Sequence, residues 1–261
     1  MLATTPYESI LVDAADGVAT LTLNRAEKRN ALSVAVMLEV TAALEAIALD
    51  RAVKAVIVRG LGPAFSAGHD LSEMLQRSVQ DYRRTFDICV RLMETIQAIP
   101  QPVIAEVGGI ATAAGCQLVA TCDLAIASSE ARFATPGVKI GLFCTTPMVA
   151  LTRAIGRKRA MEMLLTGEFI DAHTAERWGL VNRVVEPGDL AATTLALAQK
   201  IASAASFVVG LGKAAFYAQI DLDQPKAYAY AKEIMSMNAL ADDAQEGMSA
   251  FVSKRPPAWR T

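Results

Sequence analysis

The chain has 261 residues, of which 53% are hydrophobic and 20% are charged, and its formal net charge is −2. A chain of this length buries about 70–75% of the surface that it exposes when unfolded, so its core needs neither disulfides nor a metal. The near balance of acidic and basic residues, without any basic cluster, argues against a nucleic-acid partner.

The four cysteines form no C-x-x-C pair, and only two histidines are present to complement them. We therefore expect no metal site and interpret the cysteines as reduced, apolar side chains. The first residues lack the basic and apolar regions of a secretory signal. The longest uncharged stretch, residues 107–122, is too short and too broken by glycine to span a bilayer. These features predict a cytoplasmic protein without a membrane span.

The first half of the chain alternates strand-like and helix-like segments. Residues 17–24 show the two-residue period of a half-buried strand, and Ser33 is the predicted N-cap of a helix that ends near Leu49. Further strands are predicted at residues 55–60, 103–107, 124–127 and 132–134. One helix is predicted at residues 113–121, and another has on one face Phe86, Val90, Met93 and Ile96. Residues 61–71 are predicted to form a loop, and residues 135–144 an irregular segment.

From Thr145 onward the sequence is predicted to be helical, apart from a strand at residues 181–185. The last predicted helices lie at residues 188–205, 207–219 and 224–241. Alternating strands and helices followed by helices alone are typical of an α/β core with a helical tail. We assign residues 1–200 to this core and residues 201–261 to a helical region that serves oligomerisation or closes the site as a lid.

The sequence contains none of the motifs of serine hydrolases, P-loop proteins or Rossmann dinucleotide-binding proteins. Two strand-to-helix connections instead consist mostly of small residues, at 65–71 (Phe-Ser-Ala-Gly-His-Asp-Leu) and at 108–117 (Gly-Gly-Ile-Ala-Thr-Ala-Ala-Gly-Cys-Gln). Small side chains let a ligand approach the backbone, and a helix start leaves N–H groups unpaired. Two such donors that converge would stabilise a developing oxyanion. The alternative is that both connections are only close-packed turns.

Both connections belong to a series of blocks that resembles the enoyl-CoA hydratase/isomerase (crotonase) superfamily. The blocks cover nearly the whole chain in the family's order, at residues 24–32, 62–71, 102–105, 115–118, 122–124, 133–136, 141–142, 166–168, 175–182 and 246–254. Ser-Ala-Gly-His-Asp followed by Ala-Ala-Gly-Cys-Gln is most similar to the subgroup called enoyl-CoA hydratase domain-containing protein three. The resemblance implies an α/β fold, a crotonase-like spiral of ββα units with a helical C-terminal region, assembled as a trimer or as a dimer of trimers (a hexamer).

The resemblance further implies an acyl-CoA thioester ligand in the core, with CoA as part of the substrate and no separate cofactor. In the family, two backbone N–H groups hold the thioester oxygen, and these positions fall on His69 and Ala114. The positions that contact the CoA phosphates fall near Lys28 and Arg29, and the position beside the adenine falls on Ala67. A C-terminal pair that closes over the CoA of a neighbouring subunit corresponds to Phe251 and Lys254.

This chain departs from the family at the residues that move protons. Hydratases of the family carry two glutamates that act as acid and base, and this chain has Gln117 and Gly137 in their places. An amide does not exchange a proton near neutral pH, and glycine has no side chain. Residues 143–145, where dehalogenase-type relatives place an aspartate, also contain no acid. Since each general acid or base contributes roughly 10²–10⁴-fold, the chain is predicted to be a poor hydratase.

Three residues are candidates to replace the glutamates. The first is the His69 imidazole, because the ordinary pKa of histidine suits proton transfer. The alternative is that His69 only shapes the pocket. Cys144 is a nucleophile only if a helix start at Thr145 lowers its pKa, and is otherwise a packed thiol. Gln117 binds a water or the acyl chain, or merely lines the pocket.

The nominal function is therefore a hydro-lyase or isomerase of the enoyl-CoA hydratase type, active in fatty acid metabolism through an oxyanion hole. One alternative is a catalytically deficient acyl-CoA binding protein. The other is an enzyme for a different acyl-CoA reaction that uses His69 or Cys144.

Overall fold

The computed structural model describes residues 7–260 and contains two sheets. The larger sheet has six strands, in the order β1 (Ile10–Ala15), β2 (Val18–Leu23), β3 (Ala55–Gly60), β5 (Val103–Val107), β7 (Leu124–Ser128) and β10 (Arg183–Val185). Strands β1 and β2 form an antiparallel hairpin, and every later neighbour is parallel. The expected α/β core is confirmed.

The smaller sheet has four strands, in the order β4 (Ala64–Ser66), β6 (Ile110–Thr112), β8 (Arg132–Ala134) and β9 (Ile170–Asp171). Strands β3, β5 and β7 of the larger sheet are each followed at once by a strand of the smaller one, and helices follow β4 and β6. This is the spiral of ββα units that the resemblance implies. The sequence analysis predicted β8, but it assigned β4 to a loop at residues 61–71 and left β6 within the small-residue connection at residues 108–117.

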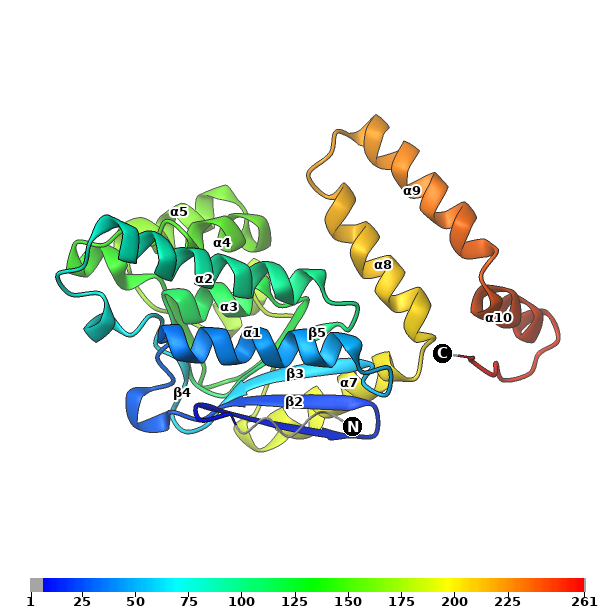
Figure 1. Ribbon diagram of the computed structural model, residues 1–261, viewed down its shortest axis with the longest axis horizontal. Helices are drawn as coiled ribbons and strands as arrows, with labels where there is room; N and C mark the ends of the chain where they lie inside the picture. Colours follow the sequence, from blue (N-terminus) through cyan, green and yellow to red (C-terminus); the bar gives the residue numbers. More distant parts are fainter. Residues whose placement is uncertain (1–6, 261) are drawn as a thin grey trace.

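Helices cover both faces of the larger sheet (Figure 1). The main apolar core joins the sheet to α1 (Val34–Leu49), α2 (Val79–Ala98) and α3 (Ala114–Thr121). A smaller cluster, which includes Ile57 and Ala198, joins the opposite face to α7 (Leu190–Ala202). Because helices pack on both faces, the central strands are apolar on both sides, as their sequences are.

The start of α1 is as predicted, since the Ser33 side chain accepts a hydrogen bond from the N–H of Val36. Helix α2 begins with a capping box between Ser78 and Asp81. Its buried face differs from the prediction at Val90, which is 38% exposed, while the neighbouring Cys89 is buried.

The second half of the chain is helical, as predicted. Helices α4 (Pro147–Ile155), α5 (Arg157–Thr166) and α6 (Ala172–Trp178) extend the core. They are followed, after α7, by α8 (Ser206–Gln219), α9 (Gln224–Ala239) and α10 (Asp242–Val252), which stand beside the core rather than on it (Figure 1). The last predicted helix thus ends earlier, and α10 is an additional helix.

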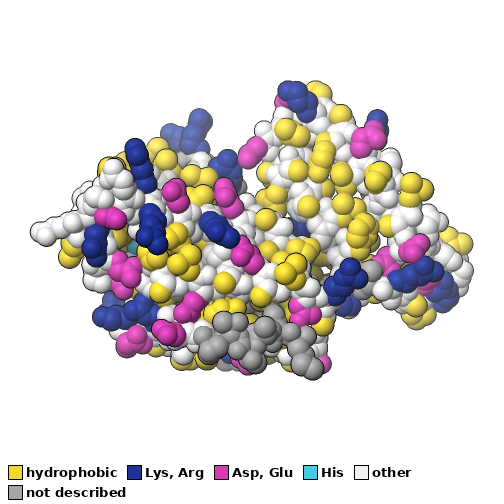
Figure 2. Space-filling view, viewed as in Figure 1, with side chains coloured by type: hydrophobic (Ala, Val, Ile, Leu, Met, Phe, Trp, Pro, Cys, Tyr) yellow, Lys and Arg dark blue, Asp and Glu magenta, His cyan; other side chains and the backbone are white. Residues whose placement is uncertain are grey.

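Apolar side chains are spread over the visible face of α8 and α9 (Figure 2). Tyr228, Met235 and Met237 of α9 are 68–70% exposed. In the part of the chain that the structure describes, no single helix is long and apolar enough to cross a membrane. One pair of helical segments, Pro187–Ala202 and Ser206–Gln219, is long and apolar enough when taken together, but it is bent by 102°.

Candidate active site

The two small-residue connections pack directly against each other. Gly68 has a φ of +90°, and a Cβ atom there would lie 2.8 Å from the Cβ of Ala113 and 2.9 Å from the carbonyl oxygen of Thr112. A Cβ atom at Gly115 would overlap the carbonyl oxygen of Ser66. Glycine at both positions therefore brings the chain around residues 66–69 into contact with the start of α3.

This packing presents two backbone N–H groups. His69 and Leu32 form a parallel bridge in which the N–H of Leu32 donates to Gly68 and that of Asp70 donates to Leu32. The N–H of His69 points the other way, and Ala114, as the first residue of α3, has no acceptor within its helix. Within residues 7–260, neither N–H has a hydrogen-bond acceptor in the protein.

The backbone before Ala114 is strained. Ala113 has a φ of +50° and a ψ of −118°, a conformation that a residue with a side chain rarely adopts. Its N–H donates to the carbonyl of Ala134 at 3.0 Å. Such strain persists where the surroundings impose it, and it is frequent at functional sites. Here it orients the first N–H of α3.

A cavity of about 350 Å³ lies at these donors. Five of the predicted site residues line it, namely Ala67, His69, Ala114, Gly137 and Cys144. The rest of its lining is mostly apolar and includes Leu71, Met74, Phe86, Pro136, Ile140, Leu142, Phe143 and Pro147. Among the described residues, no Asp or Glu contributes to this lining. The cavity is therefore apolar, with donors at one end.

The His69 ring contacts Phe86 edge to face, with ring centroids 5.6 Å apart. Neither ring nitrogen has a hydrogen-bond partner in the described structure, although both are buried. Burial lowers the pKa of His69, and this effect outweighs the opposing effects of the Leu32 carbonyl and the Glu73 carboxylate. The imidazole is therefore neutral at neutral pH.

Cys144 and Gly137 lie side by side in the cavity wall. Burial raises the pKa of the Cys144 thiol, outweighing a hydrogen bond from the backbone of Gly137. Helix α4 starts at Pro147, not at Thr145 as predicted. The condition set for a nucleophilic Cys144, a pKa lowered by a helix start, is not met.

Gln117 lies away from the cavity. It sits one turn into α3, is buried, and its amide oxygen lies 4.0 Å from the sulfur of Cys89 on α2. Gln117 lies nearly one full helical turn after Ala114, so both residues are on similar sides of α3. The Gln117 side chain nevertheless points toward α2. The structure therefore does not bring Gln117 to the two N–H donors.

The residues expected to contact CoA fall into two groups. Lys28 and Arg29 form an exposed turn that is fixed beside the cavity, since the Arg29 carbonyl accepts the N–H of Ala67 at 3.0 Å. Phe251 of α10 is 85% exposed, and Lys254 follows that helix. Helix α10 lies at the opposite end of the molecule from α2–α4 (Figure 1). Within one chain, this pair does not reach the cavity.

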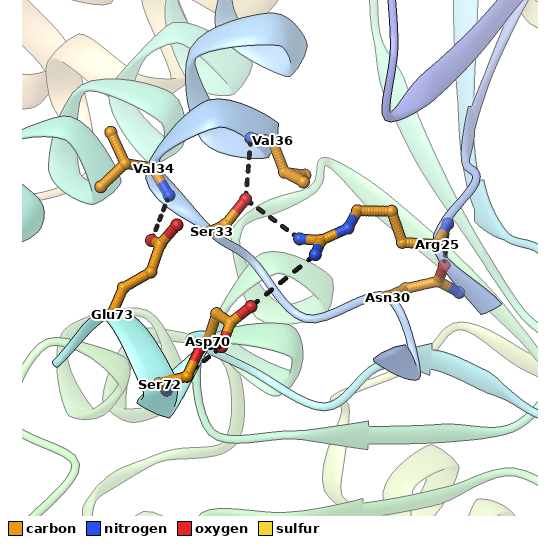
Figure 3. Close-up of polar contacts among 8 residues, drawn as sticks. All are labelled: Arg25, Asn30, Ser33, Val34, Val36, Asp70, Ser72 and Glu73. Atoms are coloured by element: carbon orange, nitrogen blue, oxygen red, sulfur yellow. Dashed lines mark hydrogen bonds and ion pairs between the residues drawn. The ribbon is translucent and has the colours of Figure 1, made fainter. Parts of the chain in front are cut away.

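A polar network around Arg25 and Asp70 lies beneath the His69 connection (Figure 3). The Arg25 guanidinium donates to the Ser33 hydroxyl at 3.1 Å and lies 3.8 Å from the Asp70 carboxylate. Hydrogen bonds from the Ser72 side chain lower the pKa of Asp70. Glu73 accepts the N–H of Val34 at 2.9 Å. The network fixes the chain on both sides of the bridge at Leu32.

Asn30 belongs to the same network. Its amide nitrogen donates to the carbonyls of Leu61 and Ala64, and its amide oxygen accepts the N–H of Arg25. Asn30 stands in one of the sequence blocks noted above, but nothing in the sequence indicates its partners Leu61 and Ala64, which lie more than 30 residues away. Asn30 therefore ties β4, which leads to His69, to the end of β2.

Residues 13–261 match the model of the enoyl-CoA hydratase/isomerase family. This chain belongs to the enoyl-CoA hydratase/isomerase family. A solved structure of a Mycobacterium smegmatis enoyl-CoA hydratase superposes with a TM-score of 0.95 at 50% identity and covers 97% of this chain and 100% of that one. Human enoyl-CoA hydratase domain-containing protein 3 gives 0.94 at 45% identity, with the same coverage. The crotonase fold and the resemblance to this subgroup are confirmed.

Among curated proteins of the family, the mouse enoyl-CoA hydratase domain-containing protein 3 is 46% identical over 94% of this chain and 82% of its own length. The mouse, human and rat proteins are all named as mitochondrial. The expected cytoplasmic location is therefore wrong by this finding. The expectation rested on the lack of a recognisable leader, which carries no information about where the protein resides.

Proposed function

We propose that this chain binds an acyl-CoA thioester in the 350 Å³ cavity and holds the thioester oxygen with the N–H groups of His69 and Ala114. The observation that carries the proposal is that His69 and Ala114 line one mostly apolar cavity and that neither backbone N–H has an acceptor among residues 7–260. Fixed donors aimed at developing charge are often the largest single contribution to catalysis. They suit any reaction that passes through a thioester enolate.

The family name points to addition of water to a 2-enoyl-CoA. In that reaction, water gives up a proton to a base as its oxygen bonds to the β-carbon, the electrons of the conjugated double bonds shift onto the thioester oxygen to form an enolate, and the α-carbon takes up a proton as the carbonyl re-forms. The two N–H groups hold the enolate oxygen, but proton transfer needs a further group. Because no Asp or Glu of the described chain lines the cavity, hydration is expected to be slower by roughly 10²–10⁴-fold for each missing group.

His69 is the side chain that we propose for the remaining proton transfer, because it lines the cavity with a neutral imidazole. Its nitrogens are buried, so the ring must turn before it contacts the substrate. We do not assign Cys144 this role, since burial raises its pKa.

A second candidate function is acyl-CoA binding without turnover. The lack of carboxylates in the described lining favours it, since binding needs the donors and the apolar cavity alone. The two functions differ only in whether a bound enoyl thioester is converted.

We further propose assembly as a trimer or a dimer of trimers, with residues 201–261 as the oligomerisation and lid region. The exposure of Phe251 and the distance between α10 and the cavity in Figure 1 support a role for this pair on a neighbouring subunit. Lys28 and Arg29, next to the cavity, are proposed to bind the CoA phosphates. Sedimentation analysis with and without Phe251→Glu tests the assembly, which the charged variant should weaken.

The test of the proposed function compares wild type with Ala114→Pro, which removes one donor. Calorimetry with butyryl-CoA measures binding, and a crotonyl-CoA hydration assay measures turnover. We expect measurable binding by wild type, and a loss of about 10²–10³-fold in any turnover for the variant. Proline is tolerated at the first position of a helix, but it also restricts the preceding residue, Ala113, so urea unfolding of the variant checks that the fold persists. Absence of butyryl-CoA binding by wild type contradicts the proposal, and binding without turnover selects the second candidate.

A further inference from the structure

A second cavity continues the first one away from the two N–H donors. It measures about 610 Å³ and lies between the segment around residues 71–86 and the turn at 140–142. Five residues line both cavities, namely Leu71, Met74, Phe86, Ile140 and Leu142. Since they share these lining residues, the two cavities adjoin, and we treat them as one channel that leads from the first cavity toward the surface.

The second cavity is apolar throughout. Besides the shared residues, only Leu75 and Tyr82 of the described chain line it, and the Tyr82 hydroxyl already donates to the Met74 carbonyl at 2.7 Å. None of these side chains carries a charge. A ligand here makes apolar contacts and finds no hydrogen-bond donor for a carboxylate.

The outer end of the channel exposes large apolar side chains. Leu75 is 72% exposed and Ile140 is 61% exposed, whereas Met74 beneath them is 9% exposed. A contiguous exposed apolar patch on a protein usually marks a binding site. Its position at the end of a channel favours a ligand that extends outward from within.

The first cavity, which lies at His69 and Ala114, also has no unpaired charge in its described lining. Its one lysine, Lys139, pairs with Glu168 at 2.7 Å, and His69 is neutral. Among the described lining residues, no unpaired cation is therefore present to hold a second carboxylate on the acyl group. This argues against acyl groups that end in a carboxylate.

Resting on the proposed function, we propose that the substrate is a thioester with a linear, uncharged acyl chain of medium to long length, whose distal part lies in the second cavity. Each buried methylene contributes about 0.8 kcal/mol. Affinity should therefore rise roughly fourfold for each added methylene until the channel is full.

The experiment measures binding of butyryl-CoA, octanoyl-CoA, dodecanoyl-CoA and the ω-carboxylated dodecanedioyl-CoA by calorimetry. The variant Leu75→Glu places a charge in the second cavity alone, and Leu49→Glu changes another exposed leucine at the end of α1 as the matched control. We expect wild type to bind octanoyl-CoA about 10²-fold more tightly than butyryl-CoA. Dodecanedioyl-CoA should bind at least tenfold more weakly than dodecanoyl-CoA. Leu75→Glu should lose at least tenfold for dodecanoyl-CoA and nothing for butyryl-CoA, while Leu49→Glu should match wild type.

If butyryl-CoA binds and longer chains gain nothing, the inference is wrong and the proposed function stands. The same holds if Leu75→Glu and Leu49→Glu lose dodecanoyl-CoA equally, or if the terminal carboxylate costs no affinity. Absence of binding by every thioester overturns the proposed function and this inference together.

Discussion

A side chain at Gly137 would overlap the carbonyl oxygen of Leu142, and its Cβ atom would also lie 2.8 Å from the sulfur of Cys144. The loop at residues 142–144 thus fills the volume that a glutamate at position 137 needs. The loop occupies its position only because residue 137 has no side chain. Replacing Gly137 alone therefore does not convert the site into that of a two-glutamate hydratase.

We therefore expect Gly137→Glu to destabilise the fold by about 1–3 kcal/mol, as overpacking of a close-packed site does. Adding Gln117→Glu should not produce a large rise in crotonyl-CoA hydration, because the side chain at 117 points toward Cys89. Urea unfolding and the hydration assay measure the two effects. Gly188→Glu is the matched control, since a Cβ atom there meets nothing within 4 Å. A stable double variant whose hydration rate is raised by orders of magnitude would contradict this prediction and show that the loop at residues 142–144 moves to accommodate the glutamate.

Gly68→Ala tests the contact that holds the two N–H donors together. The added methyl group presses on Ala113 and on the Thr112 carbonyl, so it should move the donors apart and cost about 10²–10³-fold in turnover that depends on them. Gly156→Ala shares a positive φ, +78°, but meets nothing within 4 Å, and it separates backbone strain from loss of the contact. Enoyl-CoA turnover and butyryl-CoA affinity are the measurements. Equal effects in both variants would contradict the assignment.

His69 should make the fold sensitive to mild acid. Burial lowers its pKa in the folded state, whereas the unfolded chain keeps a pKa near 6.5. Below about pH 6.5 the unfolded chain binds a proton that the folded chain does not yet bind. The free energy of unfolding therefore decreases as the pH falls through this range. Urea midpoints between pH 7.5 and pH 5 should therefore depend less on pH in His69→Leu than in wild type. His173→Gln, at a mostly exposed histidine, should keep the wild-type slope. An unchanged slope in His69→Leu would exclude this histidine as the source.

Lys213 joins the C-terminal helices to the core. Its ammonium lies 2.7 Å from the Asp123 carboxylate and donates to the carbonyls of Ile96 and Gln101, all in a buried setting. Lys213→Met leaves the Asp123 carboxylate without its cation, and breaking a buried pair costs about 3–5 kcal/mol. Guanidinium unfolding measures this loss.

Two further variants make the Lys213 prediction specific. Asp123→Asn combined with Lys213→Met should recover part of the loss, because no charge is then left unpaired. Lys226→Met removes an exposed ion pair with Asp223 and should change the unfolding midpoint little. Equal midpoints for Lys213→Met and Lys226→Met would show that the buried pair does not fasten α8.

Elements with a strong local signal could be predicted from the sequence alone. The strands at β2, β3 and β5, and the N-cap at Ser33, follow from hydrophobic period and capping chemistry, which depend on neighbouring residues only. The small-residue connections at residues 65–71 and 108–117 pointed to close backbone approach at two places, and the family resemblance placed the two proposed N–H donors there, at His69 and Ala114.

Which residues line the cavity together depends on how distant segments pack, and the sequence alone does not show this. Gln117 stands three residues after Ala114 yet lies away from the cavity, since the direction of a helical side chain depends on how α3 packs against α2. Leu142 and Cys144 close the wall at Gly137, and Tyr82 joins the outer channel, through contacts between distant segments. Such contacts leave no local pattern, because they arise from packing rather than from the preferences of neighbouring residues.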